Sequence, residues 1–284
     1  MESILALWGL QNETLTPLKT INESAWRIGE RYLLKYNPNP DQLAGSMRIA
    51  GLLAAEGIPV AEYLKTTHGQ WTTPDGTYCV MKIITGKHID LFQDDMAFEM
   101  GWGLARLHLA LANIEDKLNC RDNDFCGEWE HYIKPSLVNV PEEIVSEVEE
   151  RLLRVYKGLP RQPIHRDVHL QNILFDHGRI SGWIDFDLSR RDVRIFDLAY
   201  LLSSLLVGKT GDRSAIERWK AIYDDLLSGY GACTAVTDDE REVLPVMIIA
   251  IGLLFGAFFN KNGNIEGSKK AVHQAEWVYR ACYK

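Results

Sequence analysis

The stretch from Ile164 to Asp187, IHRDVHLQNILFDHGRISGWIDFD, constrains the fold of this chain more than any other. Two short apolar runs within it, Ile173–Phe175 and Ile180–Ile184, are joined by the residues DHGR. Asp and Gly in such a connection are typical of a tight turn between antiparallel strands. The sequence therefore predicts a small hairpin here, within an otherwise helical part of the chain.

Three polar residues flank one end of this hairpin. Asp167 and Asn172 lie on the loop that enters its first strand, and Asp185 directly follows its second strand. We expect the three side chains to converge, with Asn172 and Asp185 binding a hard cation such as Mg²⁺, whose other ligands are water and phosphate. Asp167, expected nearer to solvent, is then free to accept a proton from a hydroxyl. Taken singly, each residue also fits an ordinary role in a turn or cap.

The composition limits the class of protein. The chain has 284 residues, which suits one large bilobal domain or two small ones. Its net charge of −8 disfavours nucleic acid and anionic membrane surfaces as partners. The five cysteines are odd in number and form no CxxC pair, which disfavours a disulfide framework and a zinc cluster. We expect a cytoplasmic protein.

Residues 1–86 are expected to form a small antiparallel sheet with one helix. Apolar runs bounded by turn residues predict strands at Ala25–Ile28, Tyr32–Tyr36, Tyr63–Thr66 and Tyr78–Ile84. Asp41 to Glu56 has helical spacing and ends at Gly57. Lys35 is thereby placed on a strand.

Residues 87–284 are expected to be mainly helical. Amphipathic helices are predicted at Asp94–Asn113, Pro141–Tyr156, Asp197–Leu206 and Arg213–Tyr230. The apolar segment Val243–Phe259 is at the lower limit of a membrane span but contains Pro245 and lacks flanking basic clusters. We expect it to be a buried helix of a helical domain.

The spacing of the polar residues matches a known pattern. H-x-D-x-x-x-x-N at His165, Asp167 and Asn172 is followed by IDFD at Ile184–Asp187 and by DLA at Asp197–Ala199. This combination resembles the aminoglycoside phosphotransferase and choline kinase superfamily, and the resemblance spans most of the chain. It implies a bilobal protein-kinase-like fold of the α+β class. Its smaller, nucleotide-binding lobe would be residues 1–86, and its helical lobe, with the catalytic loop, metal site and acceptor site, residues 87–284.

The resemblance also implies roles for individual residues. Asp167 corresponds to the catalytic aspartate that orients or deprotonates the acceptor hydroxyl, and Asn172 and Asp185 correspond to the Mg²⁺ ligands. Lys35 corresponds to the strand lysine that contacts the phosphates of ATP, or of GTP in its place. His165 is expected to hold the catalytic loop through hydrogen bonds.

Further roles are less specific. The backbone around Asn22, Glu23 and Ser24 is expected to cover the phosphates. The segment Met81 to Thr85 is expected to bind the adenine, with Met81 and Ile83 as the contacting residues. Asp197 is expected to support the catalytic loop from beneath, at the start of a buried helix. The role of Asp187 is left open: it either supports the site or lies in a solvated turn. His169 is expected to be a surface loop residue. His108 is expected to pack against its helix or to cap it.

One departure stands against the family pattern. Kinase-fold enzymes commonly pair the strand lysine with a glutamate of the following helix, but Gly45–Arg48 offers none. Gln42 and Asp41, a turn earlier, are candidates to replace it. The departure keeps open a non-catalytic, pseudokinase-like nucleotide-binding module.

The expected reaction is transfer of the terminal phosphoryl group of ATP to a hydroxyl of a small molecule. An aminoglycoside is the family default; a metabolite alcohol such as choline, ethanolamine, homoserine or a sugar is the alternative. Acidic and aromatic residues at Glu128, Trp129 and Glu130, near Asp122 and Asp124, suit a cationic acceptor. A solvated helix face explains the same charges equally well. A second such group is Asp238–Glu240 with Trp277 and Tyr279.

Overall fold

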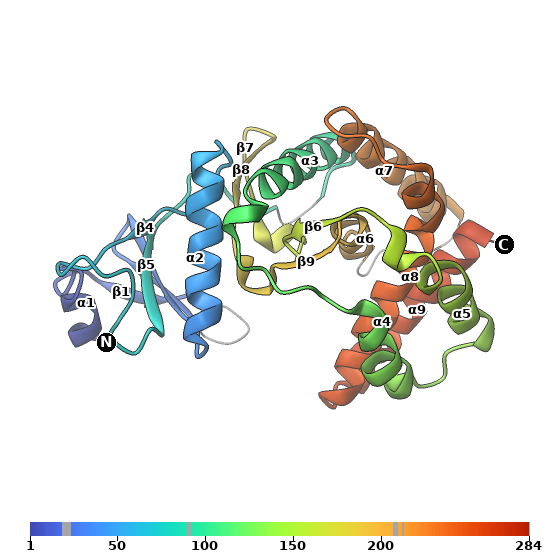
Figure 1. The fold of residues 1–284 in the computed structure, drawn as a ribbon, viewed down its shortest axis with the longest axis horizontal. Helices are drawn as coiled ribbons and strands as arrows, with labels where there is room; N and C mark the ends of the chain where they lie inside the picture. Colours follow the sequence, from blue (N-terminus) through green and yellow to red (C-terminus); the bar gives the residue numbers. More distant parts are fainter. Residues whose placement is uncertain (19–23, 90–91, 207–209, 212, 284) are drawn as a thin grey trace. The chain divides into compact units, whose positions relative to one another are not determined.

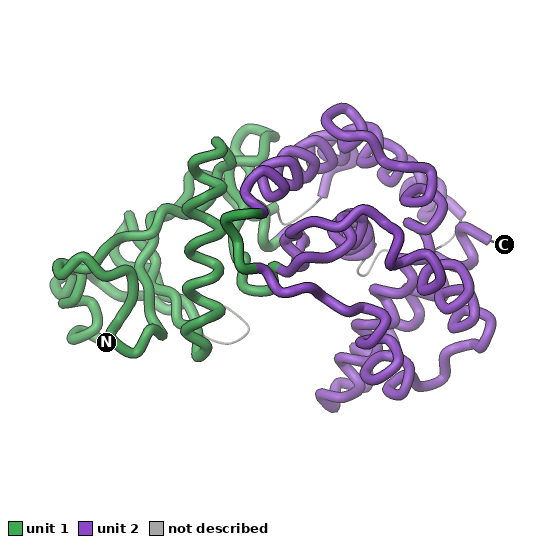
Figure 2. The backbone as a smooth tube through the Cα atoms, viewed as in Figure 1, with its two compact units in different colours: residues 1–89, 116–119, 171–189 green, residues 90–115, 120–170, 190–284 purple. Residues whose placement is uncertain are grey.

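The computed structural model describes residues 1–18, 24–89, 92–206, 210–211 and 213–283 (Figure 1). The chain forms two compact units (Figure 2). Unit 1 comprises Met1–Ile89, Asp116–Asn119 and Gln171–Ser189, and unit 2 comprises Asp90–Glu115, Cys120–Leu170 and Arg190–Lys284. The predicted hairpin therefore belongs to the same unit as the N-terminal sheet.

Unit 1 contains a five-stranded antiparallel sheet in the order β1-β2-β3-β5-β4. Its strands are β1 (Leu15–Pro17), β2 (Ala25–Ile28), β3 (Tyr32–Tyr36), β4 (Tyr63–Leu64) and β5 (Tyr78–Lys82). Successive side chains of a strand point to opposite faces. Leu34 and Val80 pack with Leu5 of helix α1 (Glu2–Ala6), whereas Cys79 and Met81 pack with Leu43 of helix α2 (Pro40–Ala55). The sheet thus has a helix on each face.

The start and end of α2 follow from its local sequence. The Asn39 side chain caps the helix by accepting a hydrogen bond from the Gln42 N–H, and Pro40 occupies the first turn. The helix ends before Gly57, whose φ of 76° is one that glycine adopts without strain. Gln42 therefore lies on the first turn of α2, where its side chain donates to the Asp187 carbonyl.

The predicted hairpin is present in unit 1 as β7 (Ile173–Asp176) and β8 (Arg179–Trp183). Its turn places His177 and Gly178 at positive φ, as a two-residue hairpin turn requires. The N–H and C=O of Lys87 both pair with Phe175, and the Trp183 N–H donates to the Pro59 carbonyl. These bonds attach the hairpin to the N-terminal part of the chain.

Unit 2 is mainly helical, with one two-stranded ladder, β6 (Arg161–Ile164) against β9 (Arg190–Val193). Its α-helices are α3 (Ala97–Asn113), α4 (Phe125–Glu128), α5 (Glu142–Glu147), α6 (Ile195–Ser204), α7 (Arg213–Gly231), α8 (Asp238–Lys261) and α9 (Ile265–Tyr283). Helices α3 and α7 approach closely through Gly101 and Gly229. A Cβ at Gly101 would lie 1.9 Å from the Leu226 carbonyl oxygen, so only glycine fits there.

Helix α8 is the apolar segment identified in the sequence. Within the described part of the chain it is the helix long and apolar enough to cross a bilayer, and 67% of its most apolar window is buried. It begins with a capping box between Thr237 and Glu240. Gly252 and Gly256 lie against Ala275 and Val272 of α9. The segment is thus largely enclosed by the helices of unit 2.

Most predicted elements are confirmed, including the strands at 25–28 and 32–36 with their bounds. The single helix predicted over 141–156 is wrong in detail, because a π-helical segment, Val148–Leu153, follows α5 and a 3₁₀ turn, Tyr156–Gly158, ends it. Strands β1, β6 and β9 and helix α9 were not predicted. The α+β class, with a small antiparallel sheet and a larger helical part, is confirmed.

Candidate active site

The loop His165–His169 of unit 2 lies between β6 and a 3₁₀ turn, η7 (Leu170–Asn172). Asp197, on the first turn of α6, fixes the start of this loop. Its carboxylate accepts hydrogen bonds from the backbone N–H groups of His165 and Arg166, both at 2.8 Å. Asp197 and His165 are fully buried. The contacts are those expected of a residue that supports the loop from beneath.

Asp197 is itself held by a buried pair of side chains. Nε2 of His108 lies 3.1 Å from Asp197 Oδ2, and Nδ1 of His108 lies 2.8 Å from the Tyr230 hydroxyl. His108 is 1% exposed. Buried polar groups cost free energy unless they are paired, so this chain of contacts fixes the orientation of Asp197. His108 therefore packs inside the unit and is linked to the loop through Asp197.

Arg166 stands in the left-handed region, with a φ of 67°. A side chain in this region is strained, and surrounding contacts must compensate. Arg166 Nη2 donates to Glu128 at 2.6 Å, and Nε lies 3.7 Å from the carboxylate of buried Asp192. Asp192 also accepts hydrogen bonds from Asn123 and Tyr156. This network sets the backbone turn that precedes Asp167.

Asp167 has two neighbours in unit 2. The Tyr200 hydroxyl donates to Oδ1 at 2.6 Å, and His169 Nε2 lies 3.5 Å from Oδ2. Burial by itself raises the pKa of Asp167, but the contacts with His169 and Tyr200 outweigh it and lower the pKa below its usual value. Asp167 is therefore ionised at neutral pH, as a hydrogen-bond acceptor for a hydroxyl must be.

Tyr200 was not identified from the sequence, although its position offered a signal. It lies three residues after Asp197 and thus on the same face of α6. Its ring stacks on His169 and contacts Phe255 of α8 edge-on. His169, expected as a surface loop residue, is a partly exposed loop residue, at 30%, and it also faces Asp167.

Lys35 of β3 is the centre of the second group of residues, all in unit 1. Its Nζ lies 2.9 Å from Asp185 and 2.8 Å from Asp187. Burial by itself lowers the pKa of Lys35, but the charges of Asp185 and Asp187 outweigh it and raise the pKa above its usual value. The lysine therefore remains a cation that can bind phosphate.

Asp187 is not a solvated turn residue, since its side chain is 15% exposed. Asn37 donates to its carboxylate Oδ2 at 2.8 Å, and Gln42 Nε2 donates to its backbone carbonyl at 2.8 Å. Gln42 thus contacts Asp187 where we expected it to contact Lys35. Asp41 is exposed. The two carboxylates that contact the lysine come from the loop after β8.

Asn172 and Asp185 lie at the same end of the hairpin. The Ile184 N–H donates to the Asn172 carbonyl, which places Asp185 one residue away from this bond. Asp185 has a left-handed backbone, with φ 67° and ψ 63°. The described residues contain no group of three His, Cys, Asp or Glu suited to a metal. One carboxylate and one amide fit Mg²⁺, which needs few protein ligands.

One expectation about exposure holds only in part. Asp167 was expected nearer to solvent, and its side chain, 19% exposed, is more exposed than that of Asn172 but less exposed than that of Asp185, which is 45% exposed. The packing of Tyr200 and His169 around Asp167 accounts for the difference. Asn172 is buried, at 6%.

The residues expected to meet the nucleotide are only partly described. Asn22 and Glu23 lie outside the described residues, and Ser24 accepts the Tyr36 N–H at its carbonyl. Met81 is buried in β5. The Ile83 N–H already donates to the Arg31 carbonyl, so a contact of Ile83 with a base would use its carbonyl oxygen.

The residues suggested for a cationic acceptor have different surroundings. Trp129 is fully buried and donates to Glu149, so it belongs to the core. Glu128 pairs with Arg166, and Glu130 is exposed. In the second group, Glu240 is a buried capping residue that pairs with Arg194, and Trp277 is buried as well. The acidic and aromatic pattern thus mainly reflects structural contacts.

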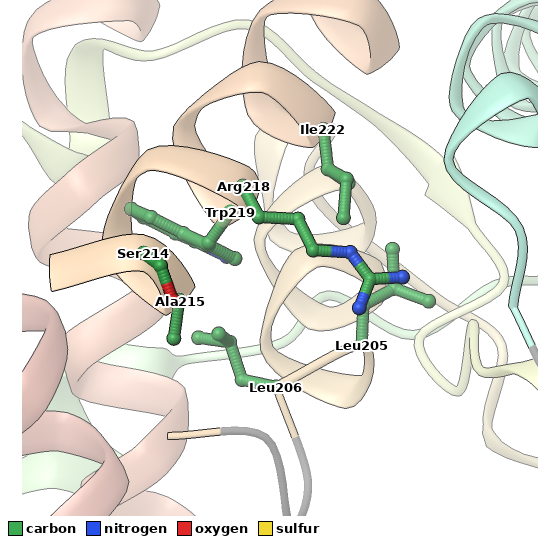
Figure 3. Close-up of a pocket in the computed structure, with 7 residues that line it drawn as sticks. All are labelled: Leu205, Leu206, Ser214, Ala215, Arg218, Trp219 and Ile222. Carbon is green, nitrogen blue, oxygen red and sulfur yellow. The ribbon is translucent and has the colours of Figure 1, made fainter. Parts of the chain in front are cut away.

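Unit 2 also has a hollow of about 190 Å³ between the end of α6 and the start of α7 (Figure 3). Apolar side chains line it, and Arg218 lies at one side, where it pairs with Asp94 through two nitrogens. None of the residues predicted for the site lines this hollow. It lies apart from the loop contacts described above.

Comparison with known proteins identifies the family. The model of the phosphotransferase enzyme family matches residues 15–238. The chain belongs to this family. A homoserine kinase of Zymomonas mobilis is 27% identical over 228 residues, covering 76% of this chain and 69% of its own length. With two further homoserine kinases, the matches span less than two thirds of the relative's length, 62% and 65%.

Solved structures of phosphotransferases confirm the fold. A structure of amicoumacin kinase with AMP-PNP, Ca²⁺ and amicoumacin has a TM-score of 0.74 at 17% identity, covering 99% of this chain and 91% of the other. A microcompartment-associated aminopropanol kinase has a TM-score of 0.74 at 15% identity, covering 98% and 94%. The expected resemblance and the kinase-like fold are therefore both confirmed.

Proposed function

We propose that this phosphotransferase is an ATP-dependent kinase that moves the terminal phosphoryl group to a hydroxyl of a small amino alcohol of the homoserine type. The observation that carries the proposal is the loop on which Asp167 is held between Tyr200 and His169, in a chain whose sequence relatives are homoserine kinases. These relatives favour the metabolite alcohol, the alternative in our expectation, over the aminoglycoside default.

The residues have distinct tasks in this proposal. Ionised Asp167 accepts the proton of the acceptor hydroxyl or orients it for attack, and the Lys35 ammonium binds and neutralises phosphate oxygens. Asn172 and Asp185 would hold Mg²⁺, which when bound neutralises charge on the phosphates. Catalysis then comes mainly from positioning and electrostatic stabilisation.

The finer assignments are part of the same proposal. ATP is the proposed donor, Mg²⁺ the metal and the cytoplasm the compartment. The five cysteines are all unpaired thiols, which suits a reducing compartment. Residues 1–86 are proposed as the nucleotide-binding lobe and residues 87–284 as the lobe that carries the acceptor.

An acceptor screen tests the function. The protein is incubated with Mg²⁺ and ATP against homoserine, aminopropanol, ethanolamine, choline and aminoglycosides, and phosphorylated products are measured by mass spectrometry. We expect one amino alcohol to be phosphorylated with a kcat/KM at least about tenfold above the aminoglycosides, the lower end of the discrimination that a difference of one methylene provides. Turnover of aminoglycosides alone would refute the acceptor class.

Two variants test the roles. Asp167→Asn should bind nucleotide normally and lose turnover, and Asp185→Ala should lose metal-dependent nucleotide binding. Asp176→Asn, an exposed aspartate at the turn of the same hairpin, is the matched control and should be active. Full activity of either site variant would contradict the assignment, and nucleotide binding without turnover in the wild type would favour the pseudokinase-like module.

A further inference from the structure

The two carboxylates that contact Lys35 are held very differently. Asp187 Oδ1 lies 2.8 Å from the lysine Nζ, and Asn37 donates to the other oxygen, Oδ2, at 2.8 Å. The Asp187 backbone is fixed as well, because Gln42 of α2 donates to its carbonyl. The Asp187 carboxylate therefore has one ion pair, through Oδ1, and one hydrogen bond, through Oδ2, and its main chain has a further hydrogen bond.

Asn37, which anchors Asp187, is rigid in turn. It is 6% exposed, its Oδ1 accepts the Asn39 N–H at 2.8 Å, and its own N–H donates to the Thr77 carbonyl at 2.9 Å. A side chain with these bonds has little rotamer freedom left. The position of the Asp187 carboxylate is thereby tied to β3, β5 and the start of α2.

Asp185 has none of this support within the described residues. Its side chain is 45% exposed, and its Oδ1 accepts a hydrogen bond from Lys35 Nζ at 2.9 Å. No second donor among the described residues reaches its carboxylate. An exposed carboxylate with one partner exchanges that partner readily.

We propose that Asp187 is the permanent counter-ion of Lys35 and takes the place of the helix glutamate that Gly45–Arg48 lacks, whereas Asp185 pairs with the lysine only until a metal binds. Asp187 is thus a positioning residue: it holds the ammonium in the place where phosphate oxygens are bound. Helix α2 contributes through Gln42, which fixes the Asp187 main chain, and not through a carboxylate. The role given to Asp185 depends on the proposed function, but the pairing of Asp187 with Lys35 does not.

The pairing can be measured without nucleotide, metal or acceptor. In ¹H–¹⁵N spectra optimised for lysine ammonium groups, a hydrogen-bonded ammonium gives a resolved signal because its protons exchange slowly with water. The Lys35 signal is assigned by its loss in Lys35→Arg. Spectra are then compared for wild type, Asp187→Asn, Asp185→Asn and the control Asp176→Asn, each checked for folding by circular dichroism.

We expect the signal in wild type, in the control and in Asp185→Asn. In Asp187→Asn, proton exchange should accelerate by about tenfold or more, because the 2.8 Å ion pair with the carboxylate that Asn37 holds in place is lost, and the signal should disappear. Asn37→Ala keeps both carboxylates and removes the anchor of Asp187 together with the bond to the Asn39 N–H, so it should also accelerate exchange, and it replaces Asp187→Asn should that variant not fold.

Three results would overturn the proposal: no signal in wild type, equal loss in the Asp185 and Asp187 variants, or loss in Asp185→Asn alone. The failure of the proposed kinase activity is seen separately, in the acceptor screen. A protein without turnover that gives the expected spectra would retain the pairing and lose only the metal role of Asp185.

Discussion

The hydroxyl of Tyr200 is expected to tune the candidate base, and Tyr200→Phe removes this hydroxyl alone. The ring keeps its contacts with His169 and Phe255, so packing is preserved. The Asp167 carboxylate loses its 2.6 Å hydrogen bond. Because this bond favours the ionised form, its loss raises the pKa of Asp167.

The magnitude follows from the type of bond. A hydrogen bond to a charged group is worth about 1.5 to 3 kcal/mol, and its loss should raise the pKa of Asp167. In the wild type the pKa of Asp167 is lower in the folded protein than in the unfolded chain, where it is about 3.8. Ionised Asp167 therefore stabilises the folded state fully above about pH 3.8, and this stabilisation is lost as the pH falls through the lower folded pKa. In Tyr200→Phe this loss begins at a higher pH.

The assay is the pH dependence of kcat with the acceptor found by the screen. The acid limb should move to higher pH in Tyr200→Phe, and kcat at neutral pH should fall about tenfold or more because Asp167 is less well oriented. The nucleotide KM should be unchanged. Tyr132→Phe, which removes a hydroxyl from a ring packed against Lys261, is the control. A wild-type kcat with an unshifted acid limb would refute the role of Tyr200.

Two further predictions concern stability and are measured by urea unfolding. Gly101→Ala should destabilise the protein by about 3 kcal/mol, because its Cβ would overlap the Leu226 carbonyl, whereas Gly51→Ala, on an open face of α2, should stabilise it by about 0.5 to 1 kcal/mol; equal effects would contradict the close helix contact. Glu240→Ala should cost about 3 kcal/mol, because it removes a buried capping residue and leaves the partly buried Arg194 without its carboxylate. A loss below about 1 kcal/mol, the value of a surface ion pair, would show that the pair is not structurally important.

The elements around the site were predictable where local pattern and tertiary environment agree. The strand with Lys35 and the hairpin before Asp185 have apolar runs bounded by turn residues, so their sequences specify them. Strands β6 and β9, RQPI and RRDV, are short and mostly polar. They pair with each other across about 30 residues of chain, which no local pattern reveals.

The site shows the same division. Asp197 was predictable because it is the aspartate of the DLA motif. Its two hydrogen bonds from the loop backbone agree with the expected support of that loop. The ion-pair partners of Lys35 were not predictable from the sequence, since they depend on the hydrogen bonds that Asn37 and Gln42 donate to Asp187 after β8. The second aspartate of IDFD, Asp187, was the available signal, and only the packing shows that its side chain is 15% exposed and contacts Lys35.

The left-handed backbone of Asp185 bears on how such a protein changes over evolutionary time. Few residues with a side chain adopt this conformation readily, and Asn is among them. A change of Asp185 to Asn would therefore preserve the turn while removing the charge proposed to hold the metal. Descendants of this chain could thus lose the proposed metal-dependent step through one substitution and keep the fold.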